Sequence, residues 1–387
     1  MPSVSVIIVS YKVRYYIEQC VDSVLRSLPD AQIIVIDNAS ADGSVEYLRS
    51  RFPQIEVIAN PENSGFGRAN NIALQHAEGR YVLFLNPDTV VAEETLPGCV
   101  NFMDENPGVG ALGVRMQYGN GRFALESRRS VPTPRVSFYH MSGLGRLFPH
   151  SRRFGRYHMT YMDRNSDCPI EVVSGAFMFA RTDVVRDLGG FDESFFMYGE
   201  DIDLSYRILK AGYANHYLPL PIVHFKGEST VKTSFRYAKV FYDAMQIFYD
   251  KHFSSYRKVF PLFVKLLLKI KQISTYIGQN IDAKRQKMTV EKEPCLFVGS
   301  KANYDKVQKL VESSAFLRDA SFIECASDIS IPDYCLTGQG AVLFDVDVFG
   351  YGKVMEWMYN TAGAGQTFTM GLFNSATGHL VTEDEVL

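Results

Sequence analysis

Polar side chains that can bind ligands follow four short apolar runs before residue 90. They are Ser10 and Tyr11, Asp37 and Asn38, Asn60 to Asn63, and Asn86 with Asp88. A carboxylate accepts N–H and O–H bonds in fixed directions, so Asp37 is suited to hold a ribose or a base. The stretch Asp37–Gly43 is also rich in residues that form turns and helix caps, and this motif alone leaves the two interpretations about equally balanced.

Two further residues suggest a metal. Asp88 lies at the end of an apolar run, where its carboxylate oxygens suit Mg2+ or Mn2+, which prefer hard oxygen ligands. The alternative is an Asx turn ahead of a helix. His224 ends the strand-like run Tyr217–Val223, and a lone histidine is more often a packed side chain than a ligand.

A cluster of acids opens a predicted helix that continues to about Ala211. Glu200, Asp201 and Asp203 all fall in its first turn, where acidic side chains stabilise the helix dipole. Three acids exceed what that role needs. A carboxylate kept ionised at such a position can also act as a general base for a hydroxyl held close to it.

The elements that position these side chains alternate between strands and helices. Buried strands are predicted at Val4–Val9, Ile33–Ile36, Glu56–Ala59 and Tyr81–Leu85. Helices are predicted around Ile17–Leu28, Gly43–Phe52 and Gly65–Ala77. This order predicts a mostly parallel sheet covered by helices, in which ligands bind outside the carboxyl ends of the strands. Small residues between Asn63 and Gly67 would let backbone N–H groups approach a phosphate there, which is weak evidence by itself.

Charge divides the chain into three parts. The formal charge of the whole is -3, which argues against a nucleic-acid partner. The net charge is -4 for residues 1–225, +9 for residues 226–292 and -8 for residues 293–387, so the basic middle suggests an anionic surface as partner. Six scattered cysteines without a C-x-x-C pair, and a start without a signal sequence, predict a reducing, cytoplasmic setting.

Three domains are expected from these patterns. Residues 1–230 form the first, and residues 231–292 form a basic amphipathic helical segment. The apolar stretch Val259–Ile273 in that segment is too short and too charged to span a bilayer. It fits equally well a helix lying on the inner face of the cytoplasmic membrane and one docked on the first domain. Residues 293–387 read as a small α/β domain with a regulatory or assembly role and no identified ligand, because G-x-G-x-x-G is absent.

Up to about residue 230 the chain resembles the family 2 glycosyltransferases with the glycosyltransferase A fold, and within them the bacterial rhamnosyltransferase-like branch. The residues that carry the resemblance are Ser5–Tyr11, Asp37–Ser44, Asn63–Asn71, Leu85–Asp88, and Gly189–Glu193 leading into Gly199–Asp201. Their joint order and spacing are specific, although no single motif is.

The resemblance implies an inverting transfer of a sugar, with rhamnose favoured, from a nucleotide-diphosphate sugar. The acceptor would be a hydroxyl of a glycan or of a polyprenyl-diphosphate-linked molecule in bacterial cell-surface polysaccharide synthesis. The nucleotide-sugar-binding candidates are Ser10, Tyr11, Asp37, Asn38, Asn63, Gly67, Asn70, Asn86 and Asp88. Asp88 matches the last carboxylate of the family's D-x-D motif and, with His224, would hold Mg2+ or Mn2+. Asn86 departs from the common aspartate, which should weaken the affinity for metal.

By the same resemblance, Asp201 would be the catalytic base and Glu200 would orient the acceptor. Arg128 or Arg129 would hold a diphosphate, although an arginine pair on a solvated loop is the more frequent case by about two to one. Ser174 and Gly175 would form the floor of the acceptor site. Two alternatives remain, a nucleotidyltransferase of related fold and a non-catalytic sugar-nucleotide-binding membrane scaffold.

Overall fold

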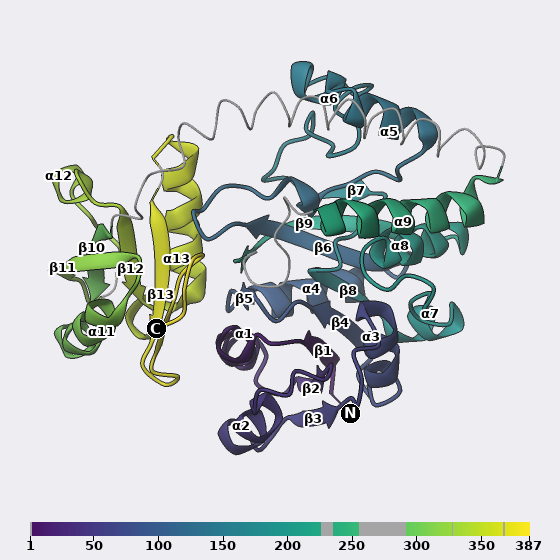
Figure 1. Cartoon of the computed structure of the whole chain (residues 1–387). Coiled ribbons are helices and arrows are strands. Elements are labelled where there is room, and N and C mark those ends of the chain that lie inside the picture. The colour runs from purple at the N-terminus through teal and green to yellow at the C-terminus, as the bar shows by residue number, and fades with distance from the viewer. Residues whose placement is uncertain (1, 226–234, 255–291, 327, 367) are drawn as a thin grey trace.

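The computed structural model describes residues 2–225, 235–254, 292–326, 328–366 and 368–387. Within these ranges the chain forms a nine-stranded sheet and a five-stranded sheet, each with its own helices, lying beside one another (Figure 1). The nine-stranded sheet belongs to what we call the catalytic domain, and the five-stranded sheet to the C-terminal domain.

The first half of the catalytic domain follows the predicted pattern. Parallel strands β1 (Val4–Ser10), β2 (Gln32–Asp37), β3 (Glu56–Ala59) and β4 (Tyr81–Leu85) lie in the order β3-β2-β1-β4. Helices α1 (Arg14–Ser27), α2 (Ser44–Arg51) and α3 (Phe66–Leu74) connect them. Every residue of β1 is buried, as its continuous apolar run predicts for a strand covered on both faces. The predicted strands, helices and parallel sheet are therefore confirmed.

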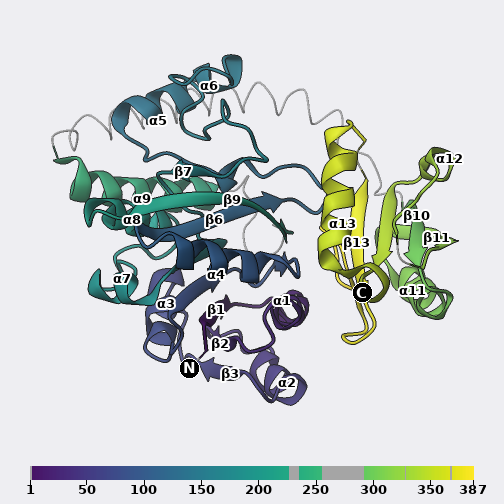
Figure 2. The same ribbon diagram turned by 180° about the vertical axis from the view of Figure 1, so that it is seen from behind.

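The second half of the sheet is mixed. Strand β8 (Phe177–Arg181) runs antiparallel to β4. The order continues through β6 (Val109–Gln117), β9 (Ala214–His224) and β5 (Thr89–Val91), with β7 (Cys168–Ile170) also paired to β9. Pairing of β5 with β9 sets Thr89 opposite His224. Helices α4 (Thr95–Glu105), α7 (Thr182–Asp187) and α8 (Glu200–Lys210) pack around these strands (Figure 2).

A helical insertion lies between β6 and β7. A 3-10 turn (Leu125–Ser127) precedes α5 (Pro134–Met141) and α6 (Leu144–Leu147), and irregular chain then leads back to the sheet. Figures 1 and 2 both place α5 and α6 at the end of the catalytic domain opposite β3 and α2. Thr133 caps α5 by accepting a hydrogen bond from the backbone N–H of Val136.

Helix α9 (Phe235–His252) belongs to the catalytic domain by its packing. Ala244, Met245 and Phe248 are buried in one cluster with residues of α8 and its preceding loop. Asp203 of α8, which is fully buried, pairs with Lys251 at 2.9 Å and with His252 at 2.7 Å. The boundary predicted at residue 230 therefore falls before α9, a helix that packs on this domain.

The C-terminal domain is the small α/β unit that the sequence predicts. Parallel strands β11 (Leu317–Glu324), β10 (Glu293–Gly299), β12 (Ala341–Asp345) and β13 (Thr369–Asn374) lie in that order, and β14 (His379–Val381) adds an antiparallel edge. Its helices are α11 (Lys301–Ser313), α12 (Asp333–Leu336) and α13 (Val346–Gly363), which kinks at Gly350.

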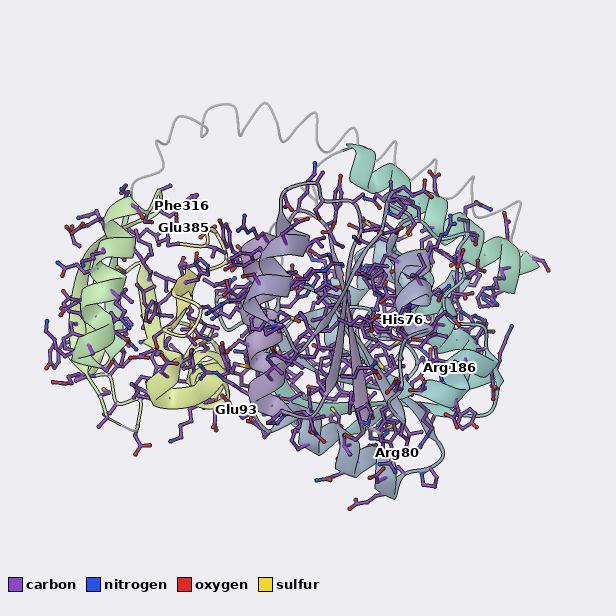
Figure 3. The ribbon with its side chains drawn as sticks, turned by 90° about the horizontal axis from the view of Figure 1, so that it is seen from below. His76, Arg80, Glu93, Arg186, Phe316 and Glu385 are labelled. Carbon is purple, nitrogen blue, oxygen red and sulfur yellow. The ribbon has the colours of Figure 1, made fainter. Side chains whose placement is uncertain are left out.

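The two domains are joined by a polar interface on α1. Asp22 accepts hydrogen bonds from Tyr351 at 3.1 Å and from Asn374 at 2.6 Å, and the Nε2 amide of Gln19 donates to the backbone of Leu372. Glu93 lies at the same boundary and accepts the backbone N–H groups of Tyr351 and Gly352, each at 2.8 Å (Figure 3). The C-terminal domain is thus packed firmly against the catalytic domain.

No helix within the described ranges is long and apolar enough to cross a membrane. The predicted amphipathic stretch Val259–Ile273 lies outside the described residues.

Candidate active site

The carboxyl ends of β1 and β2 place Ser10 and Asp37 next to each other. The two residues are register partners, and both are buried. The Ser10 hydroxyl and Asp37 Oδ1 have no hydrogen-bond partner among the described residues, whereas Asp37 Oδ2 accepts the backbone N–H of Ser40 at 3.0 Å. Because a buried polar atom without a partner costs free energy, this pair is suited to a ligand that supplies the missing bonds. Tyr11, 41% exposed, stands directly after the pair and offers a ring face.

Asn38 and Asn63 have a different task from the one predicted. Asn38 Oδ1 accepts from Asn60 Nδ2 at 2.9 Å and from the backbone N–H of Ser64 at 3.1 Å. Its Nδ2 donates to Asn63 Oδ1 at 2.9 Å. These bonds join the loops after β2 and β3, so the two asparagines shape the edge on which a ligand would lie rather than point their amides at it.

Two further candidates for nucleotide-sugar binding, Gly67 and Asn70, lie on α3. Asn70 Nδ2 donates to the backbone of Phe66, and its buried Oδ1 is without a partner in the described structure. A Cβ on Gly67 would come within 3.3 Å of the Phe191 Cβ. Gly67 therefore allows α3 to pack closely on the loop before α8, and its contact with the nucleotide-sugar stays a prediction.

Asn86, Asp88 and His224 come together where β4, β5 and β9 meet. His224 Nε2 lies 3.2 Å from Asp88 Oδ1 and 3.3 Å from Asn86 Nδ2, and Asp88 and His224 are both buried. A carboxylate oxygen suits both Mg2+ and Mn2+, and an imidazole nitrogen is a ligand for transition metals, so the Asp88–His224 pair fits such an ion. No group of three or more His, Cys, Asp or Glu in the described ranges is arranged to hold a metal ion, so a bound ion would take its other ligands from substrate and water.

Asp201 is held in place by three donors at the start of α8. Its Oδ2 accepts the backbone N–H of Gly175 at 3.0 Å and pairs with the Arg129 guanidinium, and its Oδ1 accepts the N–H of Ile202. A Cβ on Gly175 would come within 3.3 Å of the Asp201 Cβ, so glycine favours this close approach. The Arg129 ion pair was not foreseen, and Gly175 supports the base while its place in an acceptor floor stays a prediction.

Glu200 has fewer hydrogen-bond partners than its neighbour Asp201. It is buried, and its Oε2 has no hydrogen-bond partner among the described residues. Burial, and after it the negative charge of Asp201, raises the pKa of Glu200 to about 8. The side chain is therefore protonated at neutral pH and can donate a hydrogen bond to an incoming hydroxyl.

The third acid, Asp203, is structural. Burial alone would raise its pKa, but hydrogen bonds from His252 and Lys251 and the charge of Arg207 outweigh this and lower the pKa to about 2. Asp203 thus anchors α9 and Arg207 on α8, which explains why the first turn of α8 carries more acids than a helix dipole requires.

Arg128 does not take the role predicted for it. Its guanidinium is buried over the rings of Phe123 and Tyr217 and donates to the backbone carbonyls of Met162 and Asp163. It therefore organises the chain before β7, and a diphosphate has no access to it. Ser174 is likewise used locally, because its hydroxyl accepts the backbone N–H of Ala176 at 3.4 Å.

The turn at residues 174–176 connects the two chemical groups. The backbone N–H of Asn86 donates to the carbonyl of Ala176 at 3.0 Å, while Gly175 binds Asp201 from the same turn. The Asp88–His224 pair and the Glu200–Asp201 pair are thus one short turn apart. Tyr157, which lies beside Arg129 and whose pKa is raised by burial, completes the surroundings of Asp201. No spacing in the sequence indicates Tyr157.

Comparisons with known proteins identify sequence similarity to glycosyltransferases. Residues 5–189 match the family model described as glycosyl transferase family 2. The N-acetylglucosaminyl-diphospho-decaprenol L-rhamnosyltransferase of Mycobacterium tuberculosis is 26% identical over 261 residues, which cover 64% of this chain and 84% of that protein. Rhamnosyltransferase WbbL of Escherichia coli is 27% identical over 254 residues, covering 60% and 89%.

One shorter alignment has a higher sequence identity. The putative teichuronic acid biosynthesis glycosyltransferase TuaG of Bacillus subtilis is 42% identical over 108 residues, covering 27% of this chain and 43% of that protein. The family match and the two longer alignments favour a transferase over a nucleotidyltransferase or a scaffold. Residues 5–189 carry a glycosyl transferase family 2 domain, and the protein is a glycosyltransferase.

Proposed function

We propose that this enzyme transfers a sugar, with rhamnose favoured, from a nucleotide-diphosphate sugar to a hydroxyl of a glycan or polyprenyl-diphosphate-linked acceptor, with inversion at the anomeric carbon. The two longer relatives are named rhamnosyltransferases, and the name of one of them specifies a decaprenol diphosphate acceptor. By this analogy the reaction belongs to bacterial cell-surface polysaccharide synthesis on the cytoplasmic side of the membrane.

The observation that carries the proposal is the short separation between two groups with opposite tasks. A single displacement needs a base on one face of the sugar and neutralisation of the departing diphosphate on the other. Asp201 would take the proton of the acceptor hydroxyl, and the protonated Glu200 would orient that hydroxyl. Ser10, Tyr11 and Asp37 would hold the nucleotide, which is supported by the buried, unpartnered atoms of Ser10 and Asp37.

Asp88 and His224 would hold a Mg2+ or Mn2+ ion, whose charge would neutralise the leaving diphosphate. Only one of these two ligands is a carboxylate, and Asn86 adds no charge, so we expect a real but shallow requirement for metal. An Asp88→Asn variant should bind Mn2+ at least tenfold more weakly in a calorimetric titration, and excess metal should restore part of its activity. Unchanged Mn2+ binding, or full activity of the wild-type enzyme in excess chelator, would refute the assignment.

The test of the whole proposal is thermal stabilisation by a panel of nucleoside diphosphates and nucleotide-sugars, including deoxythymidine and uridine forms, with and without Mn2+. A ligand at a hundredfold its dissociation constant adds about 2.7 kcal/mol of stability, which is readily measured as a shift in Tm. A shift with one nucleotide that depends on metal would support the donor site. The absence of any shift would reject it.

A further inference from the structure

The helical insertion has a charge distribution unlike the rest of the protein. Residues 134–162 contain no Asp or Glu, although the whole chain has a formal charge of -3. The same residues contain five arginines, Arg135, Arg146, Arg152, Arg153 and Arg156. All five arginines are exposed. This end of the catalytic domain therefore presents a strongly positive surface.

Most of this charge is not neutralised within the fold. Arg135 and Arg153 both donate through Nε to the hydroxyl of Tyr139, at 3.1 and 2.9 Å, and so converge on a neutral phenol. Arg156 pairs with Glu171 at 2.7 Å. For the other four arginines of the insertion, the described residues supply no carboxylate within ion-pair distance. The guanidinium groups remain available to an anionic partner.

An apolar tip lies among these arginines. Leu147 is 72% exposed and Phe148 is 53% exposed, and α6, which ends at Leu147, buries none of its residues. The two side chains directly follow Arg146 in the sequence. Phe148 is supported from below by Phe154, with ring centroids 5.6 Å apart. Adjacent exposed apolar side chains of this size are a feature of interaction surfaces.

We propose that this surface, made by Arg135, Arg146, Leu147, Phe148, Arg152 and Arg153, docks the enzyme on an anionic lipid bilayer. Aromatic and aliphatic side chains that insert at the level of the headgroups, surrounded by cations that pair with lipid phosphates, are the chemistry of interfacial binding. The surface is separate from residues 231–292, where the sequence analysis expected membrane contact.

Its position also suits the acceptor. Helix α5 begins five residues after Arg129, the partner of Asp201, and the backbone N–H of Ser130 donates to the carbonyl of Tyr157 at 2.9 Å. The docking surface and the arginine that holds the base are therefore built on the same stretch of chain. In this respect the inference rests on the proposed function, because docking through α6 would bring Asp201 toward an acceptor held in the membrane.

The test is co-sedimentation of the full-length chain with vesicles of phosphatidylglycerol and phosphatidylcholine in equal parts, and with phosphatidylcholine alone. The double variants are Leu147→Ser with Phe148→Ser, and Arg146→Gln with Arg152→Gln. All four side chains are exposed, so the fold should tolerate both changes. Matched controls are Tyr334→Ser, whose side chain is 79% exposed on α12, and Lys301→Gln with Lys309→Gln on α11.

We expect wild-type protein and controls to bind the anionic vesicles and to be released by high salt, and each double variant to partition at least about tenfold less. Equal binding by the double variants and the wild type, or no binding by the wild type, would overturn the proposal. A wild-type dimer that becomes a monomer when Leu147 and Phe148 are replaced would also overturn it, because the surface would then join two copies.

Vesicle binding needs neither donor nor acceptor, so the two proposals fail separately. Binding without transfer to a polyprenyl-diphosphate acceptor would reject the acceptor and leave the docking surface intact. Transfer to such an acceptor with wild-type efficiency by both double variants in vesicles would reject the surface and leave the function intact.

Discussion

Both sheets of this protein have polar residues at the carboxyl ends of their parallel strands, but the two domains use them differently. In the catalytic domain, Ser10 Oγ and Asp37 Oδ1 are buried without partners among the described residues. In the C-terminal domain the polar groups at the corresponding edge form hydrogen bonds with one another. Asp345, at the end of β12, accepts hydrogen bonds from the backbone and hydroxyl of Ser300 and from Asn303 Nδ2.

Close packing also leaves little room for a ligand at this edge of the C-terminal sheet. A Cβ on Gly299, at the end of β10, would lie 2.2 Å from the Asp345 Cβ. Ser300 caps α11 by accepting the N–H of Asn303, so the first turn of that helix already has a partner. The comparison teaches that a polar sheet edge indicates a ligand only where its buried donors and acceptors are left unsatisfied by the fold.

The largest effect on transfer is expected from a substitution at the proposed base. Asp201→Asn should lower the rate of transfer by about 10²–10⁴-fold, because a general base contributes that much and an amide cannot take the proton. Nucleotide binding, measured by thermal shift, should persist, since Asp201 lies on α8 whereas Ser10 and Asp37 lie at the ends of β1 and β2. Near-wild-type turnover would show that Asp201 is not the base.

A smaller effect is expected at Glu200. Its pKa of about 8 predicts that wild-type activity falls as the pH rises through 8, when the side chain loses the proton it donates. Glu200→Gln keeps a donor, so it should retain much of kcat/KM at pH 7 and lose the fall at alkaline pH. If the variant is inactive at every pH, Glu200 rather than Asp201 is the base.

Stability provides an independent check on Glu200. A folded-state pKa raised above the ordinary carboxyl value of 4.5 means that the unfolded chain ionises first, so stability is lost as the pH rises from about 4.5 to about 8. The Tm advantage of Glu200→Gln over the wild type should therefore grow across this window. An advantage that is constant with pH would contradict the raised pKa.

The smallest effect on transfer is expected from a substitution at the polar edge of the C-terminal sheet. Asp345→Asn should lower stability by about 1–3 kcal/mol, because it leaves buried donors poorly matched, while kcat/KM stays unchanged at a temperature where the variant is folded. Chemical denaturation and initial rates measure the two quantities. Loss of transfer in the folded variant would mean that the C-terminal edge takes part in the reaction.

Much of the site could be predicted from the sequence because strand ends and helix starts are local features. Asp37, Asp88 and Asp201 each follow a recognisable apolar run or open a helix. Arg128 and Arg129 could not be told apart, since neighbouring residues of an extended chain point to opposite sides. The bridge of Arg129 to Val172 fixes which of them reaches Asp201 and which is buried.

Long-range contacts account for the other failures. Strand β6 was missed because its glycines, Gly110 and Gly113, lower its strand propensity, and they are needed where Ile208 and Val173 pack closely. The polar side chains Gln19 and Asp22 on α1 resemble a solvent-exposed face in the sequence, yet they bind the C-terminal domain. Only tertiary structure shows what covers such a face.

The interface on α1 has a consequence for how the protein is made. Tyr16 bonds to the backbone of Thr382 and Gln19 to that of Leu372, partners more than 350 positions away in the chain. At about 5–20 residues per second, those partners are synthesised roughly 20 to 70 s after α1. The helix that follows the proposed nucleotide-binding loop therefore keeps one face uncovered until the C-terminal domain has been made. A chain truncated before β13 should leave that face exposed and become a client for chaperones.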